Sequence, residues 1–297
     1  MNISMYTLFY RSLRALGAER AADLALSVGF DSVEMLEGRY VNNIPDVESA
    51  RKVRKALDSR GLRMSCYSFA TDVVCFDENG RLNDTSAESE QRAIKAASIA
   101  KELGSPYFHH TLVLNLDSEI HKKRPSFDEI FDALVASASR IAKKCNDLGL
   151  AVLYEPQGLY VNGNENFGMF YREMKRFGHN VGVCGDIGNV LFVDGSPSDF
   201  YREFADEFRH IHLKDYRCLG DSANLEKGCL RSESGKVYKE TVIGEGVVGF
   251  RECMEILKAS GYSGALSLEM EAMSDDPISE YRKTIKSIRE IFDSERK

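Results

Sequence analysis

The chain has 297 residues, of which 43% are hydrophobic and 29% charged, and its formal net charge is -7. These proportions are typical of a soluble globular protein with one large domain or two small ones. The acidic balance argues against a partner such as duplex nucleic acid or a membrane surface, because both require a basic face. No apolar run approaches the roughly 20 residues that span a bilayer.

Seven scattered cysteines form no CxxC pair, which favours free thiols over a disulfide framework or a zinc finger. The first residues lack the charged and then apolar pattern of a signal peptide. Together these features predict a cytoplasmic protein.

Short apolar segments alternate with longer amphipathic segments along the chain. The predicted strands are 3–9, 30–36, 62–70, 106–113, 150–156, 180–188, 210–215 and 264–270. The predicted helices are 17–29, 46–61, 85–104, 126–148, 166–177, 196–208, 249–260 and 276–293. Several helices begin with capping residues, such as Ser196 followed by Pro197, or end at a glycine.

Eight strand–helix units in this length predict a parallel sheet closed into a (β/α)₈ TIM barrel, a single domain over residues 1–297. The alternative is an open doubly wound sheet. It is disfavoured because no glycine-rich phosphate-binding fingerprint follows the first predicted strand.

Residues 217–247 separate the seventh strand from the seventh helix and interrupt this rhythm. A connection of this length in a compact domain is usually functional. We therefore expect a long loop or lid that contacts the substrate, with a tolerated surface insertion as the alternative.

Active sites of such barrels lie at the carboxyl ends of the strands. Four consecutive predicted strands end there in Glu155, Asp186, His212 and Glu269. Three carboxylates and an imidazole repel one another unless a cation joins them. This oxygen-rich set is typical of Mn²⁺, Mg²⁺ or Co²⁺, with Zn²⁺ also open, so the pattern predicts one divalent metal ion held by these four residues.

The segments "YEP", "GDIGN", "HIHLKD" and "SLEM", together with "GFDSVEML" and "IGEGVVGF", resemble the xylose isomerase-like TIM-barrel superfamily in its sugar phosphate isomerase/epimerase branch. The resemblance covers nearly the whole chain. It implies that all four residues bind one metal ion, and that Glu155 and Glu269 also exchange a proton with the substrate. The implied activity is isomerisation or epimerisation of a sugar, sugar phosphate or polyol-derived ketose through an enediolate. A homodimer or homotetramer is expected by analogy alone.

One position departs from the family pattern. Epimerases of the family commonly have a histidine three residues after the aspartate of strand six, where this chain has Asn189. Asparagine can hydrogen-bond a hydroxyl but cannot act as an acid. A related dehydratase or lyase acting on a keto-polyol is therefore the alternative.

Weaker candidates for substrate binding lie near the same strand ends. Lys214 is expected either to contact substrate or to face outward and pair with Asp215. Arg217 opens the long loop, and Glu34 closes the second predicted strand. His110 is expected to point inward with Phe108.

Two further functions stay open. An apurinic-site endonuclease shares this kind of barrel, but its three-metal cluster needs more histidines than the six present, and none follows His212. A non-catalytic sugar-binding barrel would keep the pocket without exchanging protons.

Overall fold

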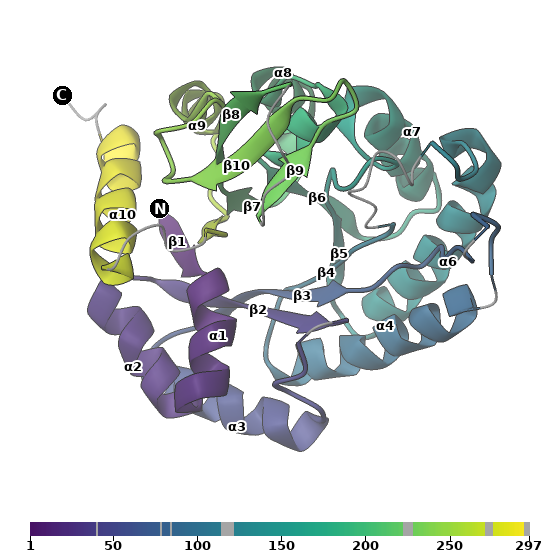
Figure 1. The fold of residues 1–297 in the computed structure, drawn as a ribbon. Coiled ribbons are helices and arrows are strands. Elements are labelled where there is room, and N and C mark those ends of the chain that lie inside the picture. The colour runs from purple at the N-terminus through teal and green to yellow at the C-terminus, as the bar shows by residue number, and fades with distance from the viewer. Residues whose placement is uncertain are drawn as a thin grey trace.

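The computed structural model describes residues 1–39, 41–77, 79–83, 85–113, 122–221, 228–270 and 276–293. Eight parallel strands close into a barrel in the order β1-β11-β7-β6-β5-β4-β3-β2, with helices around the outside (Figure 1). The barrel strands are β1 Asn2–Met5, β2 Ser32–Gly38, β3 Met64–Ala70, β4 Tyr107–His110, β5 Ala151–Tyr154, β6 Val181–Asp186, β7 Phe208–Leu213 and β11 Ala265–Leu268. The predicted (β/α)₈ barrel is therefore confirmed.

The described helices follow the strands with the alternation expected of this fold. They are α1 Thr7–Leu16, α2 Ala18–Val28, α3 Val47–Asp58, α4 Thr85–Glu102, α6 Phe127–Asp147, α7 Gly163–Arg176, α8 Pro197–Phe204, α9 Phe250–Ala259 and α10 Pro277–Asp293, with short 3₁₀ turns η1 Asn189–Val193 and η2 Ala205–Glu207. None of the helices in the described part of the chain has the length and apolar character needed to cross a bilayer.

Local sequence explains where several helices begin. The Ser126 side chain accepts a hydrogen bond from the N–H of Glu129, whose carboxylate accepts one from the N–H of Ser126, which forms a capping box for α6. As predicted, Ser196 caps α8, and Pro197 occupies the first helical position.

The first strand is shorter than predicted. β1 ends at Met5 and α1 already begins at Thr7, whereas the sequence pattern placed a strand over 3–9. Phe9 and Leu13 of α1 are buried, because the apolar residues of this stretch repeat at helical spacing and cover the barrel. The helix predicted over 17–29 is the second of two, and Gly17 separates them.

The segment 217–247, predicted as a long loop or lid, contains most of a small antiparallel sheet. Its strands are β8 Asp215–Gly220, β9 Cys229–Arg231 and β10 Val237–Thr241, in the order β8-β10-β9. This sheet stands beyond the end of β7, near α8 and α9 (Figure 1).

The buried carboxylate of Asp215 fastens this sheet to the segment that leads into α9. It accepts hydrogen bonds from the backbone N–H groups of Tyr216, Gly244, Gly246 and Val248. A Cβ atom at Gly246 would lie 2.0 Å from the Asp215 Oδ1. Only glycine therefore lets the backbone approach this carboxylate closely enough to bond it.

Two apolar layers form the core. A continuous cluster fills the space between barrel and helices, and it includes Tyr67, Phe108 and Tyr154. Inside the barrel a small separate cluster joins Cys66, Leu153 and Cys184. All seven cysteines lie in described segments and are free thiols, as expected.

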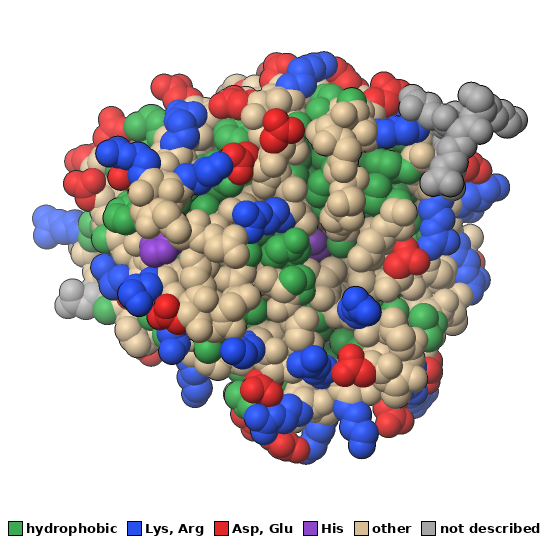
Figure 2. Space-filling view, turned by 180° about the vertical axis from the view of Figure 1, so that it is seen from behind, with side chains coloured by type: hydrophobic (Ala, Val, Ile, Leu, Met, Phe, Trp, Pro, Cys, Tyr) green, Lys and Arg blue, Asp and Glu red, His purple; other side chains and the backbone are tan. Residues whose placement is uncertain are grey.

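The outer surface carries both signs of charge. Figure 2 shows lysine and arginine side chains mixed with aspartate and glutamate on the side opposite to that of Figure 1. Exposed ion pairs of the described surface include Arg51 with Glu102 and Arg202 with Glu252.

Candidate functional site

A cavity of about 190 Å³ opens at the carboxyl ends of the barrel strands. Its lining comes from all parts of the barrel rim: Tyr6, Leu36, Arg39, Ser68, Phe69, Ala70, Thr71, Asp72, His109, Thr111, Glu155, Gln157, His212 and Glu269. The described residues of segment 217–247 contribute none of these side chains, so its role as a lid stays a prediction.

The four residues predicted as metal ligands meet beside this cavity. One ligand atom from each of Glu155, Asp186, His212 and Glu269 lies within 4.8 Å of the others; we call these four residues the mouth cluster. Asp186 and His212 are fully buried or nearly so, whereas 31% of the Glu269 side chain is exposed. The strand-end pattern of the sequence thus predicted a real convergence of side chains.

His212 lies at the centre of the mouth cluster. Its Nδ1 is 2.6 Å from Glu155 Oε1 and 3.3 Å from Glu269 Oε2. The Tyr6 ring stacks on the imidazole with centroids 4.9 Å apart and an interplanar angle of 20°. The ring is therefore held with its Nδ1 toward the two glutamates.

Asp186 is oriented by the backbone that follows it. The N–H groups of Gly188 and Asn189 donate to its Oδ1 at 2.8 and 2.7 Å. Its other oxygen, Oδ2, is directed into the cluster, where Lys214 Nζ lies 2.9 Å away. One oxygen is thus fixed by the chain and the other faces the cluster.

Lys214 is buried inside the cluster, so of the two alternatives expected for this residue the outward-facing pair with Asp215 is wrong, while its contact with a substrate stays a prediction. Its Nζ contacts Asp186 and Glu269 at 2.9 Å each and lies 3.4 Å from the Asn189 Oδ1. Lys214 continues the two-residue alternation of His210 and His212, which is why it points into the barrel. Burial acts to lower the pKa of Lys214, but Asp186 and Glu269 raise it well above its ordinary value.

The mouth cluster holds more negative charge than its neighbours balance. Burial, together with the charges of Asp186 and Glu269, raises the pKa of Glu155 to about 7, even though His212 acts against the shift. Burial would lower the pKa of His212, but Cys184, Glu34 and Glu155 raise it well above its ordinary value. Both shifts show a site that favours added positive charge.

The donor set fits a divalent cation. Three carboxylates and one imidazole supply hard ligands at mutually short distances, as expected for Mn²⁺, Mg²⁺ or Co²⁺. An ammonium group already lies between two of the carboxylates, which shows that this position attracts a cation.

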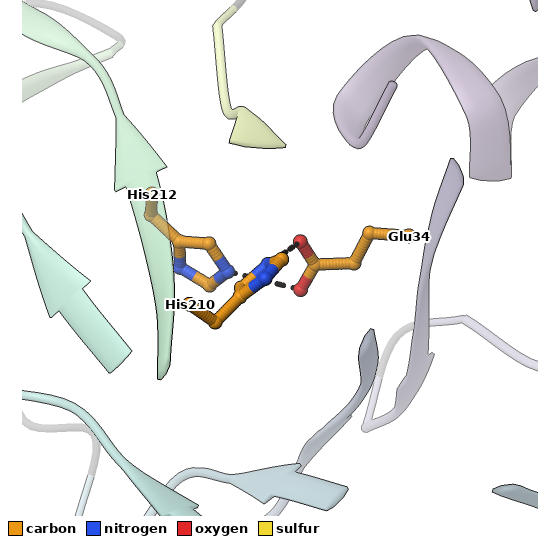
Figure 3. A group of neighbouring side chains, drawn as sticks. All are labelled: Glu34, His210 and His212. Carbon is orange, nitrogen blue, oxygen red and sulfur yellow. Dashed lines mark hydrogen bonds and ion pairs between the residues drawn. The ribbon is translucent and has the colours of Figure 1, made fainter. Parts of the chain in front are cut away.

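Below the mouth cluster lies a second polar group, which we call the deep cluster: Glu34, Ser68, His210 and Ser267. The Glu34 carboxylate accepts hydrogen bonds from Ser68 at 2.7 Å, from His210 Nε2 at 2.7 Å, from His212 Nε2 at 2.9 Å and from Ser267. Figure 3 shows both histidine rings of β7 reaching Glu34 of β2 across the barrel. Burial opposes ionisation of Glu34, but His212 and His210 hold its pKa well below its ordinary value.

Glu34 therefore does not lie where the sequence placed it. β2 continues to Gly38, so Glu34 lies well inside the strand and Leu36 and Arg39 reach the cavity instead. Arg39 contacts Asp72 in an ion pair at the rim.

His109, and not His110, lines the cavity. The expected inward direction of His110 is wrong. Its ring packs against Tyr154 and Phe108, both of which belong to the core between barrel and helices. Phe108 is too large for the narrow interior, so β4 turns its even-numbered side chains outward.

His109 was missed by the sequence reasoning, although the doubled histidine marked the position. Its Nδ1 lies 2.9 Å from the Ser68 hydroxyl, and its Nε2 lies 3.5 Å from Glu155 Oε2. The neighbouring strand supports the inward direction of His109, because the small residue Ser68 pairs with it in the β3–β4 register.

The remaining predicted residues lie apart from the cavity. Asn189 is buried beside Asp186 and Lys214, close enough to touch a ligand that reaches the mouth cluster. Arg217 lies in β8, exposed and in register with Lys239, and it is not among the cavity-lining residues in the described part of the chain.

The closed (β/α)₈ barrel with a group of potential metal-binding residues at its mouth agrees with the comparison with protein families. The family model described as xylose isomerase-like TIM barrel matches residues 22–291, and the chain belongs to that family. An inosose dehydratase of Geobacillus thermodenitrificans is 22% identical over 223 residues, covering 74% of this chain and 72% of the relative.

Solved structures share the fold at lower identity. The D-psicose 3-epimerase with D-tagatose from Clostridium cellulolyticum H10 superposes with a TM-score of 0.75 at 13% identity, covering 98% of this chain and 99% of that one. A xylose isomerase-like TIM-barrel protein from Mycobacterium smegmatis in complex with magnesium gives 0.68 at 15% identity, with 99% and 97% covered.

Proposed function

We propose that this protein is a divalent-cation-dependent enzyme that removes a proton from the carbon beside the ketone of a polyhydroxylated ketone, and that loss of water follows. The single observation that carries the proposal is the meeting of Glu155, Asp186, His212 and Glu269 at one end of the barrel, beside the cavity. The similarity to inosose dehydratases favours a cyclic keto-polyol as the substrate.

The four residues of the mouth cluster would hold the cation. When bound, a divalent cation supplies Lewis acidity that makes the neighbouring C–H bond more acidic and offsets the negative charge that develops on oxygen. The chain itself keeps these ligands in place through the Gly188 and Asn189 N–H groups on Asp186 and through Glu34 on His212.

Proton transfer would fall to the two glutamates, which follow β5 and β11 and both contact the His212 Nδ1. One carboxylate takes the proton from the carbon beside the ketone. The hydroxyl on the next carbon then leaves with a proton as water, and the resulting enol rearranges to a diketone. Substrate and product differ by one water, so the step needs no oxidant or reductant.

The cavity of about 190 Å³ suits an uncharged cyclic keto-polyol. The basic side chain of Arg39 at the cavity rim already forms an ion pair with Asp72, so it attracts a phosphate group only weakly. Polar atoms of Thr71, Gln157 and His109 line the same space and can bond hydroxyl groups.

Epimerisation is the second candidate. A pair of glutamates on the same histidine nitrogen can also return the proton to the opposite face of the carbon. The fold of D-psicose 3-epimerase favours this outcome for a ketose.

One experiment separates the two reactions. The Mn²⁺-loaded protein is incubated in deuterated water with inosose and, in parallel, with D-psicose and D-fructose. We expect loss of one water from inosose, measured by mass spectrometry and by the ultraviolet absorbance of the product, and no reaction after chelation. Deuterium at an inverted carbon without water loss would favour the epimerase, and no exchange with any of these ketones would contradict both.

A further inference from the structure

The buried carboxylate of Glu34 is saturated with hydrogen bonds. Each oxygen accepts two, Oε1 from Ser68 and His212 and Oε2 from His210 and Ser267. Glu34 is 0% exposed, so no water competes for these positions. An ionised carboxylate has about four acceptor positions, and the protein fills them with its own donors.

This arrangement determines which nitrogen of His212 can bind an ion. Because the Nε2 of His212 bonds a carboxylate that is already an acceptor, its hydrogen must stay on Nε2. The other nitrogen, Nδ1, is the one that faces Glu155 and Glu269. Only Nδ1 can therefore give up a hydrogen and offer a lone pair to the mouth cluster.

The same carboxylate acts on His109 through Ser68. A serine hydroxyl has a single hydrogen, and that of Ser68 is given to Glu34. Toward His109 Nδ1, at 2.9 Å, the Ser68 oxygen can then only accept. The hydrogen of the neutral His109 ring must lie on Nδ1, which leaves a lone pair on Nε2.

The Nε2 of His109 has no hydrogen-bond partner among the described residues. It lies 3.5 Å from a carboxylate oxygen, Glu155 Oε2. Two acceptors side by side in a buried place need a donor between them. His109 belongs to none of the potential metal-binding groups found in the described part of the chain, so that donor is better supplied by a ligand than by the cation.

We propose that Glu34 is a positioning residue that holds two histidines in the tautomers the site needs, with His212 Nδ1 free for the cation and His109 Nε2 free to accept a hydrogen bond from a substrate hydroxyl. The use of these tautomers by the enzyme rests on the proposed function, whereas the tautomers themselves do not depend on that function. Glu34 is not itself among the cavity-lining residues in the described part of the chain, so it acts through the two rings, directly on His212 and through Ser68 on His109.

Substitution Glu34→Gln tests the role with little change in size. A glutamine amide keeps one acceptor oxygen and turns the other position into a donor, so two of the four hydrogens lose their acceptor. Glu37→Gln is the matched control. Glu37 lies on the same strand, is 3% exposed and accepts backbone N–H groups of Asn43 and Ile44 instead.

The direct readout is nitrogen NMR of histidine-labelled protein without added metal. The chain has only six histidines, and each signal is assigned by replacing one of them. We expect His109 to carry its hydrogen on Nδ1 and His210 on Nε2 in the parent and in Glu37→Gln, and this pattern to change in Glu34→Gln. A hydrogen on His109 Nε2 in the parent, or an unchanged pattern in Glu34→Gln, would overturn the proposal.

A second readout is Mn²⁺ binding measured by calorimetry. Changes in the groups that orient a metal-binding histidine usually weaken metal binding by about 10- to 100-fold, and we expect a loss of this size in Glu34→Gln but not in Glu37→Gln. Equal affinities in the two variants would contradict the role of Glu34. If the parent binds no Mn²⁺, the proposed function fails while the NMR pattern still decides the tautomers.

Ser68→Ala keeps the test decisive if Glu34→Gln does not fold. It removes the link to His109 and leaves the His212–Glu34 bond. We expect Mn²⁺ affinity to stay unchanged, the hydrogen of His109 to leave Nδ1 in part, and the affinity of the Mn²⁺-loaded protein for inosose to fall by about tenfold, the cost of one good hydrogen bond. An unchanged His109 signal would overturn the link through Ser68.

Discussion

The mouth cluster and the deep cluster both combine glutamate with histidine, yet they differ in charge balance. In the deep cluster one carboxylate meets four donors, and the pKa of Glu34 lies well below its ordinary value. In the mouth cluster three carboxylates share one imidazole and one ammonium group, and the pKa of Glu155 is raised to about 7. The carboxylate of the deep cluster has donors for all its acceptor positions, whereas the carboxylates of the mouth cluster favour added positive charge.

The largest expected effect concerns Glu155 in the mouth cluster. Glu155→Gln should lower turnover of inosose by about 100- to 10,000-fold, the usual contribution of a positioned acid or base, while leaving the melting temperature nearly unchanged. Glu37→Gln is the control, because burial raises the pKa of Glu37 to about 7 as well, yet Glu37 lies away from the cavity lining. Equal activity of the two variants would contradict the role of Glu155.

The second expected effect is stabilisation of the folded protein by bound Mn²⁺. Mn²⁺ at a hundred times its dissociation constant should raise the free energy of unfolding by about 2.7 kcal/mol, seen as a higher melting temperature. Asp186→Asn should abolish this gain, whereas Asp72→Asn, at the cavity rim outside the cluster, should retain it. A gain that survives in Asp186→Asn would place the ion elsewhere.

His110 is a buried histidine outside both clusters, so its pKa shows what burial does without neighbouring carboxylates. Burial lowers its pKa to about 4, whereas the neighbours of His212 raise the pKa of that ring. Since the unfolded chain takes up this proton near pH 6.5, stability should fall as the pH drops from 6.5 toward 4, by roughly 2 kcal/mol down to pH 5. His110→Phe should flatten this slope in urea melts, and identical slopes would refute the assignment.

The smallest effect belongs to the deep cluster. Ser267→Ala removes one of the four donors to Glu34 and should cost about 1 kcal/mol of unfolding free energy, the usual net contribution of one hydrogen bond, with Mn²⁺ affinity little changed. This is the reverse of the result expected for Glu155→Gln, which should cost activity and not stability. A loss of cation binding without loss of stability would contradict this structural role of Ser267.

The sequence predicted the barrel and the mouth cluster because both depend on short-range patterns. Strand–helix alternation indicated the closed sheet, and two-residue periodicity placed Glu155, Asp186, His212 and Glu269 at strand ends. The register pairs His212 with Asp186 on one side and with Ser267 on the other, and the role of the four residues as metal ligands stays a prediction.

Features that depend on distant segments could not be read in this way. Glu34 bonds two residues about 180 positions away in the chain, and no local pattern marks such a contact. The inward direction of His109 depends on the space inside the barrel, which accepts Ser68 and Cys66 but leaves Phe108 to the outer core. The small sheet β8-β10-β9 likewise leaves no clear strand pattern in the sequence, because its strands are short and largely polar.

The central claim is that the mouth cluster binds one divalent cation. Calorimetric titration of the chelator-treated protein with Mn²⁺, next to Asp186→Asn and Glu269→Gln, tests it most directly. The account predicts about one site per chain in the parent and affinities at least tenfold weaker in both variants. Absence of binding in the parent, or binding that neither substitution weakens, would contradict it.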